Sequence, residues 1–362
     1  MSRAALLAMV VAVVSVAAGC GDDAVPAPSG PDEIDLGPMP YAKLSDYGFF
    51  VGDMVRHEPA PGVVPYEVTA SLWADHAEKK RFIVLPEGGA AIWTQREDWE
   101  LSTGSIIIKA FSFPADLRDP GGPGRAIETR LLIREADGWS AHTYLWNDEQ
   151  TEAYREVAGA DVNVSYLDFD GVATEQPYIV PNNNQCKGCH GRDDRVELLG
   201  LITPQLNRAV ERDGAEVEQL AWLAEQGIFG TIAPPPADLE RFADPFGGEP
   251  VEKRARSYLA ANCSHCHRPG GGGGDSGLVL LAWEESLAKI GVCKQPAAAG
   301  AGTGGFSHDI VPGLPEESIM LFRMRSTDPE IKMPELPNLL PDARGAEVVS
   351  AWIAGMQPVG CD

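Results

Sequence analysis

The sequence predicts a multi-domain protein in which an N-terminal antiparallel β domain, with a sandwich or barrel-like fold, is followed by mostly α-helical segments. Three observations support this fold class. Short runs rich in Ile, Val, Thr, Phe and Trp alternate with turn residues between positions 41 and 180. Apolar residues recur at helical spacing after Pro181. Two pentapeptides of the form Cys-x-x-Cys-His lie within this helical part.

The first 40 residues carry signals of export. Arg3 precedes an apolar run that ends at Cys20, too short for a membrane span but of the length of a signal-peptide core. We predict a signal peptide over residues 1–19 and a polar, proline-rich tether over residues 20–40. The small residues before Cys20 resemble the lipobox of bacterial lipoproteins. That resemblance implies that acylated Cys20 anchors the chain in the cell envelope, facing the periplasm or the outer surface. Ordinary cleavage with a free Cys20 is the alternative.

Residues 41–180 are predicted to form the β domain. Asp137-Gly138 is typical of a hairpin turn between two of its strands. Five tryptophans are expected to pack in the core of this domain: Trp73, Trp93, Trp99, Trp139 and Trp146. The strands are predicted at Lys79–Leu85, Ser105–Phe111, Ala126–Ile133 and Trp139–Trp146.

Two helical regions follow. Residues 181–245 are predicted to form a first helical segment, with helices over Pro204–Arg212 and Ala215–Gln226. Residues 246–362 are predicted to form a second helical domain, with helices over Val251–Asn262 and Asp342–Met356. The run Gly270–Gly274 lacks the lysine and the helix context of a phosphate-binding loop, so we interpret it as a connector.

Each pentapeptide has the form that attaches a c-type haem. Two thiols three residues apart reach the two vinyl groups of one porphyrin, and the next imidazole points at the iron. A redox disulfide or a zinc site is the alternative, but neither requires a histidine after the second cysteine twice over. The sequence therefore predicts two covalently attached haem c groups. Their residues are Cys186, Cys189 and His190 in the first motif and Cys263, Cys266 and His267 in the second.

Two further cysteines, Cys293 and Cys361, remain. In an oxidising compartment such a pair is expected to form a disulfide. Closing so long a loop stabilises a fold by about 4 kcal/mol on the chain-entropy model. Two separate thiols are the alternative.

The chain is strongly acidic, with a net charge of −24. Nucleic acid and anionic lipid surfaces are poor partners for such a surface. A basic redox protein would be attracted to it, although a solvated acidic surface needs no partner. No other small-molecule substrate is evident.

Residues 246–362 resemble small single-haem cytochromes c in the order of helix, haem motif, glycine-rich loop, Met-Pro and terminal helix. The resemblance is carried by Cys263, Cys266, His267, Met333-Pro334 and Trp352. It implies a cytochrome c-like domain in which His267 is the proximal iron ligand and Met333 the distal one. Pro334 holds the preceding residue extended, which suits a loop ligand, and a thioether ligand raises the reduction potential.

Other residues of this domain are weaker candidates for the distal ligand. Met320, Met324 and Met356 have the spacing of core methionines. His308 lies in a polar loop. His265, inside the motif, is expected to face solvent.

The first motif has no local sixth ligand, because no Met or His occurs between Gly191 and Asn262. The ligand must come from elsewhere or be absent. An open position would bind a small molecule such as peroxide, oxygen or nitric oxide. The candidates are Met54, His57, His76 and His142 in the β domain and Met324 in the second helical domain, of which His76, His142 and Met324 are favoured.

The order of β domain, haem motif and cytochrome c module resembles a group of exported di-haem c-type cytochromes from bacteria. The resemblance implies this fold and two haems rather than a pathway. It is carried by Tyr66, Leu72-Trp73-Ala74-Asp75, Glu78-Lys79-Lys80-Arg81-Phe82, Glu128-Thr129-Arg130-Leu131-Leu132, Tyr144-Leu145-Trp146-Asn147, Asn184-Gln185 and Ser326-Thr327-Asp328-Pro329.

We therefore expect an electron carrier at the cell envelope, in which the two haems relay electrons to a partner. A di-haem peroxidase-type enzyme and a small-ligand sensor or docking subunit are the alternatives. No acid-base pair suited to cleaving peroxide is recognisable near the first motif. The charged residues from Arg192 to Arg195 are typical of a solvated turn.

Overall fold

The structure is a computed structural model that describes residues 39–192, 195–230, 236–297, 300–335 and 338–361. The predicted signal peptide, Cys20 and nearly all of the tether lie outside these residues. The described residues belong to one compact unit. Within them, no helix has the length and apolar character needed to cross a bilayer.

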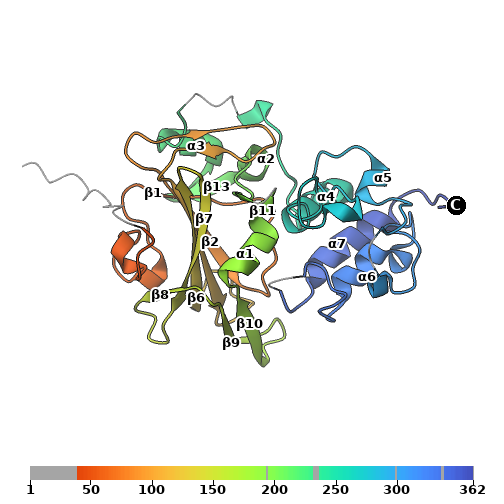
Figure 1. The fold of residues 1–362 in the computed structure, drawn as a ribbon, viewed down its shortest axis with the longest axis horizontal. Helices are drawn as coiled ribbons and strands as arrows, with labels where there is room; N and C mark the ends of the chain where they lie inside the picture. The colour runs from red at the N-terminus through yellow and green to blue at the C-terminus, as the bar shows by residue number, and fades with distance from the viewer. Residues whose placement is uncertain (1–38, 193–194, 231–235, 298–299, 336–337, 362) are drawn as a thin grey trace, which may run out of the picture. The chain divides into compact units, whose positions relative to one another are not determined.

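A six-stranded antiparallel sheet organises the N-terminal part (Figure 1). Its strands follow the order β1-β2-β5-β6-β7-β8. The predicted hairpin is confirmed, because β6 and β7 pair closely with Glu135 opposite Gly138. All four predicted strands are also confirmed, as β2, β5, β6 and β7. The bounds are β1 (Val63–Pro65), β2 (Glu78–Val84), β5 (Ile106–Pro114), β6 (Gly124–Glu135), β7 (Gly138–Trp146) and β8 (Ala153–Glu156).

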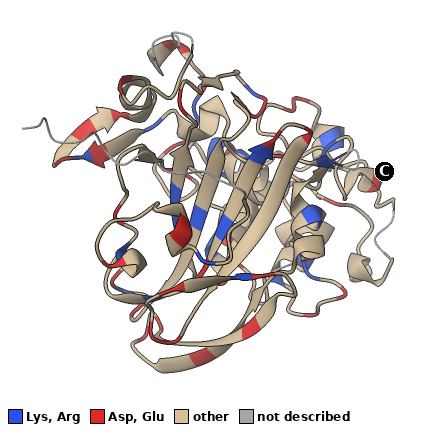
Figure 2. Ribbon diagram, turned by 60° about the vertical axis from the view of Figure 1, so that its left-hand side comes forward, with Lys and Arg blue, Asp and Glu red and all other residues tan. Residues whose placement is uncertain are grey.

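The sheet has two different faces, because successive side chains of a strand point in opposite directions. One face carries Ile108, Leu131, Tyr144 and Trp146 into an apolar core. The other face carries Arg81, Lys109 and Arg130, which lie directly opposite one another on β2, β5 and β6. We call these three residues the basic row. Figure 2 shows Lys and Arg on adjacent strands of the sheet.

Apolar clusters flank the basic row on its own face. Ile83 and Ile107 pack with residues that follow the first motif, including Leu201 and Leu223. Phe111, two residues beyond Lys109, packs with a second cluster from the β9–β10 hairpin. The row therefore lies half-buried between these clusters. Small hairpins complete the β structure: β3 (Ala91–Ile92) with β4 (Glu100–Leu101), and β9 (Ala160–Leu167) with β10 (Ala173–Val180).

The region 181–245 contains strands as well as helices, so its prediction as helical is wrong in part. Asp213-Gly214 forms a turn with φ values of 53° and 76°, the conformation that an Asp-Gly hairpin turn requires. This turn joins two strands where helices were predicted. The elements are α1 (Asn183–His190), β11 (Gly191–Arg192), β12 (Arg195–Val196), α2 (Thr203–Leu206), β13 (Ala209–Arg212), β14 (Ala215–Glu218) and α3 (Gln219–Glu225).

The C-terminal part is helical, and both of its predicted helices are confirmed. Asp342 caps the terminal helix by accepting a hydrogen bond from the Gly345 amide at 3.0 Å. A Cβ atom at Gly345 would lie 2.1 Å from the Tyr258 ring, so glycine lets this helix approach α4 closely. The helices are α4 (Val251–Asn262), α5 (Leu287–Ile290), α6 (Ile319–Arg325) and α7 (Ala343–Ala354).

Short 3-10 helices occur in the loops of both parts. They are η1 (Ser45–Tyr47), η2 (Met54–Arg56), η3 (Pro236–Asp238), η4 (Gly274–Ser276), η5 (Gly300–Thr303) and η6 (Pro315–Glu317).

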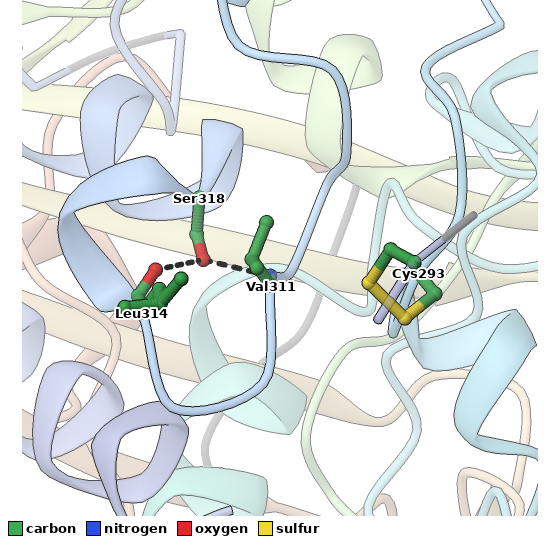
Figure 3. The surroundings of a disulfide bond; sticks show 5 residues. Cys293, Val311, Leu314 and Ser318 are labelled. Atoms are coloured by element: carbon green, nitrogen blue, oxygen red, sulfur yellow. Dashed lines mark hydrogen bonds between the residues drawn. A yellow bond between two sulfur atoms is a disulfide. The ribbon is translucent and has the colours of Figure 1, made fainter. Parts of the chain in front are cut away.

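A disulfide joins Cys293 to Cys361, with an S–S distance of 2.06 Å, as the sequence predicts (Figure 3). Nearby, the Ser318 hydroxyl donates to the Leu314 carbonyl at 3.0 Å and accepts from the Val311 amide at 2.9 Å. These bonds fix the loop that precedes α6.

A contact made by Trp73 and Asp75 ties the N-terminal part to the C-terminal part. The Trp73 amide donates to Asn262 Oδ1 at 2.7 Å, and its indole donates to the Leu340 carbonyl at 2.8 Å. The Asp75 carboxylate, 1% exposed, accepts from the amides of Leu339 and Leu340 at 2.7 and 2.9 Å. Asn262 directly precedes the second haem motif. The contact therefore fixes the segment that enters this motif.

Replacing Asp75 by Asn should lower the free energy of unfolding by about 1.5–3 kcal/mol, because one of two buried amides would face an NH2 group instead of a charged acceptor. Asn tolerates the positive φ of 51° at this position, so the change isolates the lost hydrogen bond. Urea denaturation measures the effect. The matched variant Asp53→Asn, at an exposed carboxylate, should change stability by less than about 0.5 kcal/mol. Equal midpoints for the two variants would contradict the importance of this contact.

Candidate functional site

The first motif lies on α1, whose start is fixed by a reciprocal cap. The Asn182 side chain accepts from the amides of Asn184 and Gln185, and the Gln185 side chain accepts from the Asn182 amide. Backbone amides at the start of the helix, which have no acceptor within the helix, thereby gain side-chain acceptors. The cap sets where the helix begins. It therefore sets the direction of Cys186 and Cys189, which follow within the next two turns.

The motif residues of α1 line a cavity of about 390 Å³. This volume lies within the range of small-molecule and cofactor sites. The cavity is bounded by the sheet, by the segment after α1 and by the end of α4. Its walls are largely apolar and aromatic, including Trp73, Phe111, Leu132, Leu198, Leu281 and Trp283. A flat apolar ring system suits such walls.

The basic row lines the sheet side of this cavity. Arg130 is paired with Glu128 at 2.5 Å, and Glu128 also accepts from the Tyr178 hydroxyl at 2.7 Å. Among the described residues, Arg81 donates to the Ser71 hydroxyl and a backbone carbonyl, both at 3.4 Å, beyond the normal hydrogen-bond range. The Lys109 ammonium forms no hydrogen bond or ion pair within the described part of the chain. Within the described part of the chain, Glu128 is the carboxylate that forms an ion pair with the row, while the charge of Glu67 also acts on Arg81 and Asp98 lines the same cavity.

Enclosed like charges are costly unless an anion balances them. Burial lowers the pKa of Lys109 well below its usual value, and the neighbouring Arg81, Lys79 and Arg130 lower it further. Burial also lowers the pKa of Arg81. The cavity thus suits a ligand that is apolar over most of its surface and carries an anionic group toward the sheet.

Both motif histidines are held in one tautomer. His190 Nδ1 lies 2.9 Å from the Glu197 carbonyl, which only accepts, so Nδ1 carries the proton. His267 Nδ1 lies 3.0 Å from the Ser276 hydroxyl, whose own proton is donated to the Gly273 carbonyl at 2.6 Å. The hydroxyl therefore accepts from the imidazole. In both rings Nε2 is left unprotonated, as in histidines that bind a metal.

Both rings are also neutral at pH 7. Burial lowers the pKa of His190 to about 4, partly opposed by its hydrogen bond to Glu197. Burial likewise lowers the pKa of His267 to about 4, with a smaller contribution from His265. A neutral imidazole is the form that binds a metal ion.

The glycine-rich loop after the second motif does more than connect two segments. A Cβ atom at Gly273 would lie 3.0 Å from ring atoms of His267, and one at Gly271 would lie 2.5 Å from the Cys266 carbonyl. The loop therefore wraps closely around the motif and brings Ser276 to its histidine. Interpreting it only as a connector missed this packing.

The two motifs touch each other. The Cys266 thiol lies 3.7 Å from the Gly188 carbonyl. Cys189 hydrogen-bonds with both Cys266 and His265, and the bond with Cys266 is the main cause that lowers the pKa of Cys189. Neither motif contains a disulfide. Segments 77 residues apart in sequence thus meet at their cysteines.

Three of the predicted sixth ligands for the first motif lie on the far face of the sheet. Thr143 lies opposite Arg130, so its side chain is on the face of the basic row. Because successive side chains of a strand point in opposite directions, the imidazole of His142 points away from that row. Its Nε2 lies 2.9 Å from the Ser140 hydroxyl on that far face. His57 packs edge-on against the ring of Trp146, and Met54 packs against the same core.

The other two candidates are also held elsewhere. His76 packs against the rings of Trp73 and Phe169, with centroid distances of 4.7 and 5.7 Å. Met324, 7% exposed, belongs to the core of the C-terminal part. Of the five predicted ligands, only His142 belongs to the residues that line the cavity, and strand alternation turns its imidazole to the far face of the sheet. The other four have packing roles and are not among the described lining residues.

Around the second motif, Met333 differs from the other methionines. Met320 and Met356 pack against the C-terminal core and Met324 lies within it, whereas Met333 is not part of that cluster. The Met333 amide donates to the Arg323 carbonyl at 3.0 Å, which fixes its loop against α6. His308 is held in a β-bridge with Ser318. Met333 therefore stays the predicted distal ligand.

Some residues of the site gave no sequence signal. The hydroxyl of Ser276 and the carbonyl of Glu197 become partners of the histidines only through loop conformation. The basic row did have a signal, since basic residues at alternate positions occurred inside predicted strands. Among the described residues, no cluster of three or more His, Cys, Asp or Glu side chains is arranged to hold a bare metal ion.

No protein-family model, curated protein or solved structure matches this chain. The function is therefore inferred from the chemistry of the residues themselves.

Replacing Ser276 by Ala should raise the reduction potential of the second motif's haem by a few tens of millivolts. The loss of the acceptor for Nδ1–H makes His267 a weaker donor to iron and so favours the reduced state. Potentiometric titration of the haem-loaded protein measures this shift. The first motif, whose histidine bonds a backbone carbonyl, is an internal control, and Ser307→Ala, at an exposed serine of the same part, is a matched variant. An unchanged second potential would contradict a coupling between Ser276 and iron.

Proposed function

We propose that this protein is a di-haem c-type cytochrome that carries electrons at the cell envelope. The observation that carries the proposal is the shared state of the two motif histidines. Each follows a pair of cysteines, is neutral, and has Nδ1 bonded to a fixed acceptor so that Nε2 is available. Each haem iron would supply a one-electron ferrous/ferric couple. Metal-binding histidines are typically oriented by such a second partner.

The first cavity fits a haem in three respects. Cys186 and Cys189 supply thiols for the two thioether bonds, and His190 supplies the proximal nitrogen. Apolar walls enclose the volume around them. The basic row offers Arg81 and Lys109 to the carboxylates that a porphyrin carries as propionates, which explains why cations without local acidic partners are retained there.

The second site would be held by Cys263, Cys266, His267 and Met333. A cytochrome c-like fold for residues 246–362 is supported by the close packing of α4 on α7 at Gly345 and by the loop that wraps His267. A sandwich-like arrangement of the β part is supported by the separate apolar clusters on the two faces of its sheet.

The contact between the motifs supports electron exchange within the chain. Cys266 and Gly188 lie within 3.7 Å, so groups attached to the two motifs would be neighbours. The Trp73–Asp75 contact holds the segment entering the second motif against the wall of the first cavity. The arrangement of the two attachment segments is therefore built into the fold.

The sequence outside the described residues supports the location. A signal peptide and an acylated Cys20 would tether the chain to a membrane, in a compartment where haem attachment and the Cys293–Cys361 disulfide both occur. The net charge of −24 favours a basic redox partner and disfavours nucleic acid. Binding to such a partner would weaken as ionic strength rises.

A di-haem peroxidase-type enzyme is the second candidate function. It requires an open coordination position on the first iron. Four of the five predicted sixth ligands are not among the described lining residues, and the imidazole of the fifth, His142, points to the far face of the sheet, which favours such an opening. The identity of the sixth ligand therefore separates a carrier from an enzyme.

Replacing Met333 by Ala should convert one of the two haems from low spin to high spin, because the distal position of the second iron would lose its strong-field ligand. The optical spectrum of the ferric protein measures the change. The matched variant Met320→Ala removes a methionine that packs against the core and should leave both spectra unchanged. A spectrum of Met333→Ala identical to that of the wild type would show that another residue is the ligand.

Replacing Lys109 by Gln should lower the reduction potential of the first haem, because a buried positive charge near the iron stabilises the reduced state. Potentiometric titration should show the first potential falling while the second is unchanged. Lys43→Gln removes an exposed lysine and should affect neither. If Lys109→Gln left the first potential unchanged, the basic row would not face the haem.

A further inference from the structure

His265, the third residue of the second motif, belongs to the cavity of the first motif. The sequence analysis expected it to face solvent, and this expectation was wrong. The residue is half-buried and lines the same cavity as Cys186, Cys189 and His190. Its imidazole hydrogen-bonds with the Cys189 thiol. The motif that binds one haem thus places a second imidazole beside the attachment site of the other.

The remaining histidines and methionines of the described chain are held elsewhere. Met39, Met54, His57 and His142 lie with the core on the far face of the sheet. Met320, Met324 and Met356 belong to the C-terminal core or pack against it. His76 lies among aromatic rings, and His308 lies in a β-bridge. His267 and Met333 are assigned to the second site. Three described histidines belong to the residues that line this cavity: His142, His190 and His265. Strand alternation turns the imidazole of His142 to the far face of the sheet, which leaves His265 as the candidate beside His190.

The backbone that carries His265 is fixed on both sides. The Ser264 hydroxyl donates to the Ala260 carbonyl at 2.6 Å, and the amides of Cys266 and His267 donate to the Cys263 carbonyl at 3.1 and 2.9 Å. Asn262, at the end of α4, is held by the Trp73 amide. The backbone position of His265 is therefore set by the fold.

We propose that His265 supplies the sixth ligand of the first haem iron. This inference rests on the proposed function, since it requires a haem on Cys186 and Cys189. If Cys189 adds across a vinyl group, the π bond of that group breaks, sulfur bonds to one vinyl carbon and the thiol proton is transferred to the other. The hydrogen bond between the Cys189 thiol and His265 is then lost, and the ring would be free to turn toward the iron. An imidazole nitrogen of His265, which lines the same cavity as His190, is then available.

The assignment links the two redox centres through the chain. His265 would bind the first iron, and His267, two residues later, the second. The linkage offers a short covalent path between the haems. With two imidazole ligands the first iron would be closed to peroxide, which favours the carrier over the enzyme.

Replacing His265 by Ala tests the assignment in the haem-loaded, full-length protein. Electron paramagnetic resonance of the ferric wild type should show two low-spin haems. The variant should show one low-spin and one high-spin haem, and the high-spin haem should bind cyanide. Added imidazole should restore the low-spin signal. His265→Met should keep a sixth ligand and raise the potential of the first haem, because a thioether replaces a nitrogen ligand. His308→Ala is the matched control and should resemble the wild type.

Two results would overturn the proposal. One is a His265→Ala protein with two low-spin haems, and the other is a wild type in which one haem is already high-spin. Failure of the proposed function gives a different result, because a pyridine haemochrome assay would then find fewer than two haems per wild-type chain. If the His265→Ala protein does not accumulate, the wild-type spectrum and the His265→Met variant still test the assignment. A His265→Met protein with unchanged reduction potentials would show that residue 265 does not bind the first iron.

Discussion

A row of enclosed positive charge on one face of the sheet is the constraint on which the first site depends. Arg81, Lys109 and Arg130 lie side by side on three adjacent strands, and among them Glu128 supplies one carboxylate. A fold that served only stability would replace such residues with apolar ones, because buried charge costs more than it returns. Their retention beside a cavity lined by two cysteines and a histidine has a direct physical explanation. The cavity would suit an anionic, largely apolar group.

The same sheet explains how distant segments of the chain meet. The two apolar clusters that flank the basic row leave a space between them, which α1 and the end of α4 help to enclose. The Trp73–Asp75 contact then holds the segment entering the second motif, and the motifs touch at Cys189 and Cys266. Hydrogen bonds of the folded chain itself would therefore set the relative positions of redox centres attached to the two motifs.

Much of this organisation was predictable from periodicity and spacing. Strands β2, β5, β6 and β7 were predicted because β-branched and aromatic residues are dense there. Helix α4 was predicted as the helix that leads into the second motif, and α7 as the terminal helix with an apolar stripe. The hairpin at Asp213-Gly214 was missed, since apolar residues on either side of it matched helical spacing by chance. Its Asp-Gly pair was the stronger local signal.

The sequence predicted the cysteines and histidines of the two motifs but not the residues that surround them. The motif cysteines and histidines are adjacent in sequence, so their chemistry is local. The partners of those histidines, Ser276 and Glu197, depend on how loops fold back, which no local pattern records. The sequence offers His142 and His76 as iron ligands. In the structure the strand register points His142 to the far face of the sheet, and His76 packs against aromatic rings. His265 was misjudged for the converse reason, because its surroundings come from a motif 75 residues earlier.

The most direct test of the account is the intact mass of the exported, mature wild-type chain, with peptide mapping of the two motifs. The account predicts a mass increase of two haem groups, one on the peptide that contains Cys186 and Cys189 and one on the peptide that contains Cys263 and Cys266. An unmodified chain, or a chain modified at one motif only, would contradict it.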